Sequence, residues 1–399
     1  MGMNQTPSGE RLHIGFFGKR NAGKSSVVNA VTGQNLAIVS EVKGTTTDPV
    51  YKSMELLPLG PVVVIDTPGL DDEGELGLLR ISKARQVINK TDIGIIVIDG
   101  TRGMGSQEEE LVTLFEKKKI PYLLVYNKKD LCTAAGETGK NSQWVSAVTG
   151  EGIRELKEAI GRLRPDGNDG RVLLSDLIEP GDFVVLVVPV DKAAPKGRLI
   201  LPQQQAIRDT LDRGAVAIVC KDNELADTLG MMKKKPKLVV TDSQVFPLVD
   251  KITPKDILMT SFSVLFARYK GNLWQAAEGA RALETLKNGD KILVSEDCTH
   301  HRQCGDIGTC KLPAMIKKYT GKEPEFVFTS GTEFPEDLSG FSMVVHCGGC
   351  MLTEREMKYR LAMAADQNIP MTNYGIIMAY MGGILERSLK PLITGKHQQ

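Results

Sequence analysis

Two short segments rich in cysteine and histidine carry the most distinctive chemistry of this sequence. The first reads Cys298-Thr-His300, and the second, much later in the chain, reads His346-Cys347-Gly-Gly-Cys350. Thiolates and imidazoles at such spacing are typical ligands of structural zinc and of iron–sulfur clusters. The two glycines can adopt positive φ values, which would direct both flanking thiolates to one metal. From the residues alone, zinc bound by three cysteines and one histidine is as plausible as a cluster.

The remaining cysteines are weaker candidates. Cys304 and Cys310 follow Cys298 at equal spacing and could supply alternative ligands, although a small buried residue is the commoner role of cysteine. Cys132 and Cys220 lie in other parts of the sequence and are interpreted as core or surface thiols. The seven cysteines lack the regular spacing of a disulfide framework. This favours a reducing compartment.

A second group of motifs, near the N-terminal end, is typical of a nucleotide site. The sequence Gly18-Lys-Arg-Asn21-Ala-Gly23-Lys24-Ser25 matches G-x-x-x-x-G-K-[ST], with an apolar run before it and a helical pattern after it. In this context backbone N–H groups at a helix N-terminus bind phosphates. Lys24 would contact the β- and γ-phosphates, and Ser25 would bind Mg²⁺.

Further motifs follow in the order found in GTP-binding domains. Asp66-Thr-Pro-Gly69 would add a carboxylate to the Mg²⁺ shell and a glycine N–H near the γ-phosphate. The segment Asn127-Lys-Lys-Asp130 matches N-K-x-D, in which the aspartate accepts hydrogen bonds that guanine offers and adenine does not. Thr46 lies where the first switch is expected. The predicted GTP-binding residues are Gly18, Asn21, Gly23, Lys24, Ser25, Ser26, Asp66, Gly69, Asn127, Lys128, Asp130, Ser146 and Ala147, and the predicted Mg²⁺ ligands are Ser25, Thr46 and Asp66.

Apolar runs of strand length precede the nucleotide motifs. The runs Leu12–Phe17, Val62–Ile65, Ile93–Asp99 and Tyr122–Tyr126 alternate with helical patterns, which predicts a mostly parallel sheet covered by helices. A cluster of Pro, Gly and Asp at 164–170 is typical of a linker and ends this block.

A second block repeats the alternation of strand and helix without any chemical motif. Its strand-like runs are Phe183–Val190, Ala215–Cys220, Leu238–Val240 and Ile257–Met259, and its helical patterns cover 203–213 and 224–234. Apolar runs of this length suit buried parallel strands. We expect a small α/β domain with a structural or self-association role.

Both metal-type segments directly follow strand-like runs in the third block. A helical pattern covers 273–286, and the runs Lys291–Ser295, Glu325–Phe328 and Ser342–Val345 predict strands. Because the carboxyl ends of parallel strands share one edge of a sheet, the two segments are expected to meet there. Thr353-x-x-Glu resembles a capping box that opens a helix. The N-terminus of that helix would favour an anionic group nearby.

Composition limits the classes of partner. The 399 residues include 50 basic and 49 acidic side chains, for a formal charge of +1, which does not favour nucleic acid or an anionic membrane. The N-terminal segment 1–10 is polar, unlike a signal peptide, and no apolar run reaches the ~20 residues needed to span a bilayer. We therefore expect a cytoplasmic protein without membrane or nucleic-acid partners.

The first block resembles the translation-factor-class GTPases close to Era and MnmE, whose phosphate loop also reads N-x-G-K-S-S. This resemblance implies that Asn21 helps to hold a potassium ion that stands in for an arginine finger. Leu70 follows the Asp66 motif, so the glutamine that orients water in Ras-like proteins is missing. Slow intrinsic GTP hydrolysis, stimulated by K⁺, is the expected activity.

The combination of such a GTPase with C-x-H and H-C-x-x-C resembles the HydF family of FeFe-hydrogenase maturation GTPases. The resemblance implies a 4Fe–4S cluster on Cys298, Cys347 and Cys350, with an exchangeable fourth position. His300 and His346 are candidates for the fourth ligand or for hydrogen-bond donors beside it. The resemblance further implies a homodimeric scaffold that receives a diiron precursor from radical-SAM maturases and delivers it to apo-hydrogenase.

The sequence therefore predicts an α/β protein of three domains. These are an Era-like GTPase domain with a mostly parallel sheet (1–168), a small α/β dimerisation or structural domain (169–269) and an α/β cluster-binding domain (270–399). The alternative is a zinc-stabilised Era-like GTPase that acts in RNA modification or ribosome assembly. The near-neutral charge and the absence of a KH-type RNA-binding module argue against it. An enzyme of radical chemistry is disfavoured because C-x₃-C-x₂-C is absent.

Overall fold

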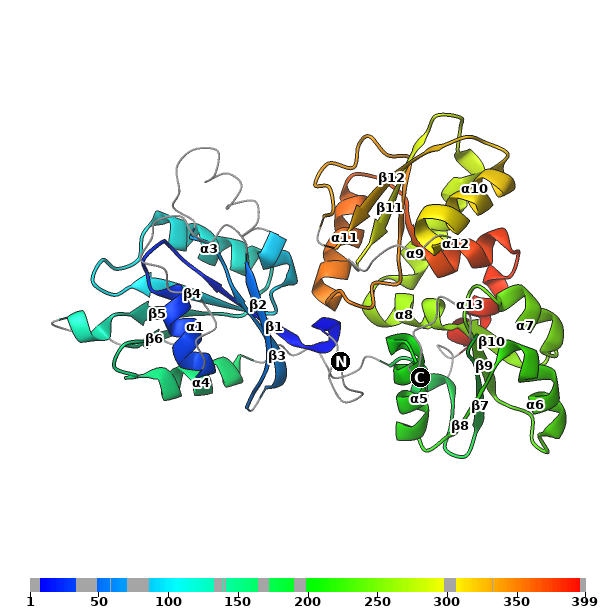
Figure 1. The fold of residues 1–399 in the computed structure, drawn as a ribbon, viewed down its shortest axis with the longest axis horizontal. Coiled ribbons are helices and arrows are strands. Elements are labelled where there is room, and N and C mark those ends of the chain that lie inside the picture. Colours follow the sequence, from blue (N-terminus) through cyan, green and yellow to red (C-terminus); the bar gives the residue numbers. More distant parts are fainter. Residues whose placement is uncertain are drawn as a thin grey trace. The chain divides into compact units, whose positions relative to one another are not determined.

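The computed structural model describes residues 8–33, 49–57, 59–69, 86–132, 139, 141–163, 172–189, 199–297, 306–331 and 333–394. The chain forms two compact units that divide between residues 169 and 170, and Figure 1 shows the elements of each. The α/β fold class predicted from the sequence is confirmed, with three sheets in all. The predicted domain limits at 168 and 269 stay predictions.

The N-terminal unit is a six-stranded sheet with helices on both faces. Its strand order is β2-β3-β1-β4-β5-β6, and only the pairing of β2 with β3 is antiparallel. The strands are β1 (Leu12–Phe17), β2 (Val50–Leu56), β3 (Gly60–Asp66), β4 (Ile93–Asp99), β5 (Tyr122–Asn127) and β6 (Ser142–Trp144), and the helices include α1 (Lys24–Thr32), α3 (Ser106–Lys117) and α4 (Ile153–Arg162). Val28 of α1 and Ile160 of α4 share one core, whereas Phe115 of α3 packs on the opposite face.

The C-terminal unit contains two four-stranded sheets whose strands are all parallel. Their orders are β10-β9-β7-β8 and β12-β11-β13-β14. The strands are β7 (Phe183–Val187), β8 (Val216–Cys220), β9 (Leu238–Thr241), β10 (Leu258–Ser261), β11 (Lys291–Glu296), β12 (Glu325–Ser330), β13 (Met343–His346) and β14 (Met371–Asn373). The helices are α5 (Leu201–Asp212), α6 (Leu225–Met231), α7 (Phe246–Ile252), α8 (Phe262–Lys270), α9 (Leu273–Ala280), α10 (Leu312–Thr320), α11 (Glu354–Asp366), α12 (Tyr374–Met381) and α13 (Leu385–Thr394).

Helices cover both faces of each of these sheets (Figure 1). Around the first sheet, α5 and α8 pack on one face and α6 and α7 on the other. Around the second, α11 covers one face while α10 and α12 cover the opposite one. Strands that are buried in this way explain the continuous apolar runs of the sequence.

Helices that follow both sheets of the C-terminal unit contribute to the hydrophobic core of its first sheet. Val264 of α8, Ile376 of α12 and Leu389 of α13 belong to one buried cluster. The last helix, α13, packs on β10 of the first sheet, where Thr260 Oγ1 donates to Ser388 O over 2.9 Å. Helix α13 is thus held against the first sheet of the C-terminal unit.

Two elements differ from the sequence-based expectation for physical reasons. The run Phe183–Val190 forms a strand only to Val187, and Pro189, which lacks an N–H, follows. The antiparallel strand β2 was not predicted, because most of its residues are exposed and it has no apolar run.

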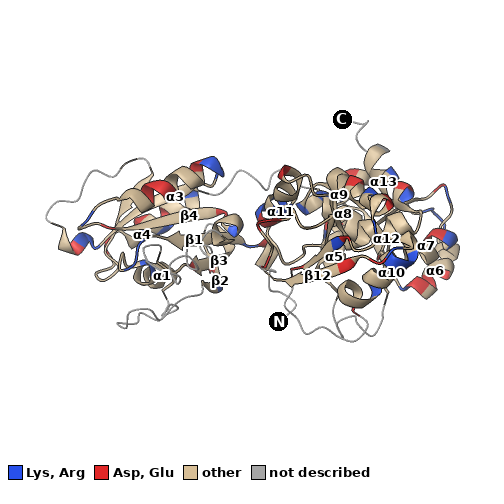
Figure 2. Cartoon of the chain, turned by 90° about the horizontal axis from the view of Figure 1, so that it is seen from above, with Lys and Arg blue, Asp and Glu red and all other residues tan. Residues whose placement is uncertain are grey.

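Both signs of charge occur on the helices of each unit (Figure 2), in keeping with the balanced composition. Within the described residues, no helix is long and apolar enough to cross a membrane.

Candidate functional site

The phosphate loop, which we define as residues 18–25, joins β1 to α1 with a backbone that only certain residues tolerate. Gly23 caps α1 with a φ of 87°, and a Cβ atom at this position would lie 2.3 Å from Asn127 Nδ2. Asn21 also has a left-handed φ, of 61°, and is exposed. The glycine spacing of the motif is therefore explained by a left-handed turn and by the close approach of Asn127.

The predicted Mg²⁺ ligands Ser25 and Asp66 lie side by side. Ser25 Oγ donates to Asp66 Oδ2 over 2.6 Å, and the neighbouring Lys24 Nζ donates to Gly18 O (3.0 Å) and Lys19 O (2.8 Å). Burial raises the pKa of the Asp66 carboxyl, although the hydrogen bond from Ser25 and the charge of Lys24 act in the opposite direction. Asp66 Oδ1 is buried and accepts no hydrogen bond from the described residues. An acceptor of this kind fits a divalent cation.

Asn127 connects the base-binding loops to the phosphate loop. Its Nδ2 donates to Ala22 O over 3.1 Å, and its Oδ1 accepts from Ala147 N over 3.1 Å. Lys128 is held by an ion pair with Asp99 at 2.6 Å, while Asp130 is exposed beside it. Asn127 thus occupies the centre of the predicted nucleotide site and joins three of its motifs.

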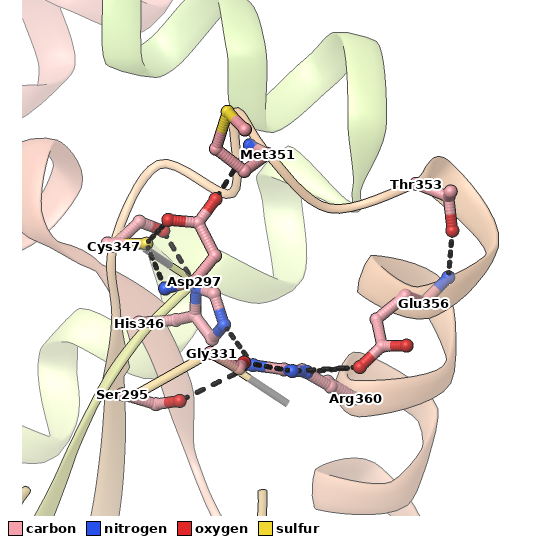
Figure 3. A network of polar contacts seen from close by, with 9 residues as sticks. All are labelled: Ser295, Asp297, Gly331, His346, Cys347, Met351, Thr353, Glu356 and Arg360. Atoms are coloured by element: carbon pink, nitrogen blue, oxygen red, sulfur yellow. Dashed lines mark hydrogen bonds and ion pairs between the residues drawn. The ribbon is translucent and has the colours of Figure 1, made fainter. Parts of the chain in front are cut away.

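The second metal-type segment lies at the carboxyl edge of the second C-terminal sheet, beside the residues that lead up to the first segment. Ser295 of β11 pairs with His346 of β13, and Cys347 N donates to Ser295 O over 2.9 Å. Asp297, which directly precedes Cys298, donates its N–H to Cys347 Sγ (3.3 Å) and accepts from that thiol at Oδ1 (3.0 Å), as Figure 3 shows. The convergence expected from the parallel sheet is observed up to the residue before Cys298.

We call residues 347–352 the thiol loop, and its backbone is anchored at both ends. Met351 N donates to Asp297 Oδ2 over 2.7 Å, and Gly349 adopts a φ of 66°. Thr353 caps α11, since its Oγ1 accepts from Glu356 N over 3.2 Å. Only this half of the expected capping box is formed, because the Glu356 carboxylate pairs with Arg360 instead.

Arg360 is fully buried and organises the polar groups behind the thiol loop (Figure 3). It donates to His346 Nε2 (2.8 Å), Ser295 Oγ (3.4 Å), Gly331 O (3.1 Å) and Glu356 Oε1 (2.8 Å). A guanidinium can only donate, so His346 Nε2 is an acceptor and its Nδ1–H donates to Cys347 O over 2.9 Å. Burial, reinforced by the charge of Arg360, lowers the pKa of His346 to about 4. Both ring nitrogens of the neutral His346 therefore have protein partners.

The pKa values of the two thiols in the thiol loop, Cys347 and Cys350, are raised. Burial, with the charge of Asp297 as the second cause, raises the pKa of Cys347 well above its usual value and that of Cys350 to about 11. A buried thiol in this environment becomes a thiolate when a metal supplies the compensating charge. Within the described residues, no three His, Cys, Asp or Glu side chains group as a metal site, and the third predicted thiol is not among them.

Several predicted residues lie outside the described part of the chain. These are Thr46, Leu70, Cys298, His300 and Cys304, together with the linker at 164–170. Cys310 is exposed, Cys220 ends β8, and Cys132 belongs to the N-terminal unit.

Sequence reasoning missed Asp297 and Arg360. Asp297 had a usable signal, since it is a polar residue between a buried strand and a predicted ligand. Arg360 had a misleading one, because its spacing from Glu356 is that of an exposed helical ion pair.

Three family models match the chain in succession. Residues 13–128 match the model described as 50S ribosome-binding GTPase. Residues 173–271 match the Hydrogen maturase F dimerization domain, and residues 274–391 match the Hydrogen maturase F tetramerization domain. The N-terminal model agrees with the geometry of the phosphate loop, and the last one covers the thiol loop.

Curated relatives resemble only part of the chain. GTPase Der of Kosmotoga olearia is 35% identical over 127 residues, which are 31% of this chain and 28% of the relative. The tRNA modification GTPase MnmE of Legionella pneumophila is 35% identical over 153 residues, which are 38% of this chain and 34% of the relative. The chain thus spans about a third of the length of these relatives.

Among solved structures, Era of Aquifex aeolicus is similar, with 21% sequence identity and a TM-score of 0.35. The superposition covers 60% of this chain and 97% of the Era chain. The bacterial selenocysteine-specific elongation factor EF-Sec covers 46% of this chain and 33% of its own, with 21% identity and a TM-score of 0.34. The GTPase model followed by two hydrogen-maturase domains gives the assignment: the chain belongs to the HydF family of hydrogenase maturation GTPases.

Proposed function

We propose that this protein is a GTP-hydrolysing scaffold that holds a 4Fe–4S cluster on Cys298, Cys347 and Cys350 and carries the diiron precursor of the FeFe-hydrogenase active site. The observation that carries the proposal is the pair of contacts between Asp297 and Cys347. These contacts lie in the region that matches the hydrogen-maturase tetramerization domain. Cys298 is the next residue in the sequence after Asp297, which supports it as the third ligand.

The hydrogen bonds of His346 favour a cluster over a structural zinc site that would use His346 as its fourth ligand. A zinc site with three cysteines requires a fourth protein ligand, usually histidine. His346 uses one ring nitrogen for Arg360 and the other for Cys347 O, so its ring is best suited to a hydrogen-bonding role. When bound by three thiolates, a 4Fe–4S cluster has one iron that can exchange an outside ligand, which is the chemistry a carrier requires. His300 remains a candidate ligand or donor at that position.

The nucleotide site is proposed to bind GTP with Mg²⁺ on Ser25, Thr46 and Asp66. The buried Asp66 Oδ1, without a hydrogen-bond donor among the described residues, supports a cation at this position. We further propose that K⁺ stimulates hydrolysis through Asn21, whose side chain is exposed on a left-handed residue of the phosphate loop. GTPase rates that are equal in K⁺ and in Na⁺ would exclude this role.

We propose that the first sheet of the C-terminal unit self-associates through β8. This strand is at the edge of its sheet, and its Val216 and Val219 are 42% and 47% exposed. An apolar edge strand offers unpaired N–H and C=O groups to another strand. A second copy of the chain is the proposed occupant, since this region matches a dimerization domain. Radical-SAM maturases and apo-hydrogenase are the other partners implied by the family.

Metal analysis of anaerobically purified protein tests the cluster. We expect about four iron and four sulfide per chain, with a broad visible absorption band. The Cys347→Ser variant should lose most of this iron, whereas the control Cys220→Ser, at the end of β8, should keep it. One zinc per chain in place of iron would overturn the proposal and favour the zinc-stabilised GTPase.

A further inference from the structure

A buried lysine from the middle of the chain reaches the thiol loop. Lys270 is the last residue of α8 and is 2% exposed. Its Nζ donates to Cys350 O over 3.1 Å and to Leu352 O over 3.2 Å. The ammonium also lies 6.0 Å from the centre of the Phe266 ring, on the same helix. A charged group is therefore enclosed directly behind one of the proposed cluster ligands.

We propose that Lys270 is a positioning residue for the thiol loop and that its charge raises the midpoint potential of the cluster held there. The proposal rests on the cluster assignment made above, and it names a residue outside both metal-type motifs. Lys270 precedes the region that matches the tetramerization domain and ends the helix that covers the first sheet. The cluster environment would then depend on both sheets of the C-terminal unit.

The positioning half of the proposal follows from hydrogen bonds on three successive residues. Lys270 holds the carbonyls of Cys350 and Leu352, and Asp297 holds the N–H of Met351. Two buried side chains of opposite charge thus fix the backbone just before α11 begins. Ligand loops that are fixed by such outer contacts bind metal more tightly, because the loop loses less conformational entropy when the metal binds.

The electrostatic half follows from the charge of the bound group. A 4Fe–4S core on three thiolates is anionic, and it gains a further negative charge when it accepts an electron. A cation that is shielded from water by burial interacts strongly with such a charge. The more negative form is stabilised most, so the ammonium raises the midpoint potential of the one-electron couple.

Three variants of the whole chain test the role of Lys270, and two different measurements test its two halves. Lys270→Met removes both the donor and the charge, Lys270→Arg keeps both, and Lys358→Met removes an exposed lysine of α11 as a matched control. The midpoint potential, from an anaerobic titration followed by electron paramagnetic resonance, should become more negative in Lys270→Met. It should stay near the wild-type value in Lys270→Arg and in Lys358→Met. An unchanged potential in Lys270→Met would overturn the electrostatic half.

Hydrogen exchange on metal-free protein tests the positioning half independently of any cluster. The amides of residues 347–353 should exchange several-fold faster in Lys270→Met than in wild-type protein or Lys358→Met. Equal exchange rates would overturn this half. If Lys270→Met does not fold, Lys270→Arg provides the test. Wild-type amide protection and a wild-type midpoint potential in that variant would support the proposal. Loss of both would contradict it. A wild-type protein that binds no iron would instead refute the proposed function and leave the exchange result standing.

Discussion

The phosphate loop and the thiol loop both follow a strand at the carboxyl edge of a sheet, but different kinds of residue hold them. In the phosphate loop, the supporting contacts come from other motif residues, such as Asn127 on Ala22 and Ser25 on Asp66. In the thiol loop, the support comes from Asp297 and Lys270, which belong to neither metal-type motif. The described motif residues thus support one another around the phosphate loop, whereas the thiol loop is supported by residues that no motif marks.

The largest effect is expected from Arg360→Met, which removes the fully buried guanidinium behind the thiol loop. The guanidinium is inaccessible and pairs with Glu356, so its loss leaves a buried carboxylate without its partner, at a cost of about 3–5 kcal/mol. Urea unfolding would measure this in a Trp144→Phe background, where Trp274 of the C-terminal unit is the remaining tryptophan. GTP affinity should be unaffected. A loss no greater than that of the exposed control Lys358→Met would show that the network does not support the loop.

The Asn127→Ala variant tests how far Asn127 supports the phosphate loop. Asn127 is buried, and both ends of its amide are bonded, so the variant leaves Ala22 O and Ala147 N without these partners. We expect a loss of ~1–3 kcal/mol in GTP binding, roughly ten- to a hundredfold in affinity. Titration with a fluorescent GTP analogue would measure it, with the exposed Asn141→Ala as control. The iron content should not change, because the hydrogen bonds of Asn127 described above are made within the N-terminal unit.

The sequence predicted the fold well where one local pattern determined the structure. Strands such as β4 and β11 are continuous apolar runs, and the Gly23 turn is required by its motif. It failed where the structure depends on distant partners. Lys270 looks like an ordinary basic residue at a helix end, and its burial depends on a loop that lies far along the chain. The packing of α13 on β10 likewise has no local signal.

An ion pair away from both loops joins Arg387 of α13 to Asp250 of α7. Burial alone would raise the pKa of Asp250, but the hydrogen bonds and charges of Arg387 and Lys255 outweigh it and hold the pKa below its usual value. Such a carboxylate stabilises the fold above its unfolded pKa of ~3.9, and this contribution is lost as the pH falls through the lower folded value. Arg387→Met should therefore cost about 1–2 kcal/mol at neutral pH and progressively less below pH ~4.

Urea midpoints at pH 7 and pH 3.5, in the Trp144→Phe background, would measure this difference. Arg208→Met removes an exposed partner of Asp212 and serves as the control, with little or no expected change in stability because solvent screens that ion pair. A destabilisation by Arg387→Met that is equal at both pH values would mean that the Asp250 charge contributes nothing. GTP affinity should be unchanged in both variants.

The smallest effect is expected from His346→Asn, and this variant separates a ligand from a positioning residue. Asparagine keeps a donor close to Nδ1, so the hydrogen bond to Cys347 O can be retained, while the acceptor for Arg360 is lost. If His346 only positions the loop, iron content and the electron paramagnetic resonance spectrum of the reduced cluster should stay close to those of the wild type. If its imidazole binds iron, the nitrogen hyperfine coupling of the wild-type spectrum should disappear. Because both nitrogens of the neutral ring are hydrogen-bonded, we expect no such coupling. Cys347 and Cys350 of the thiol loop, together with Cys298, would then supply the ligands, and the residues around the loop would set its shape.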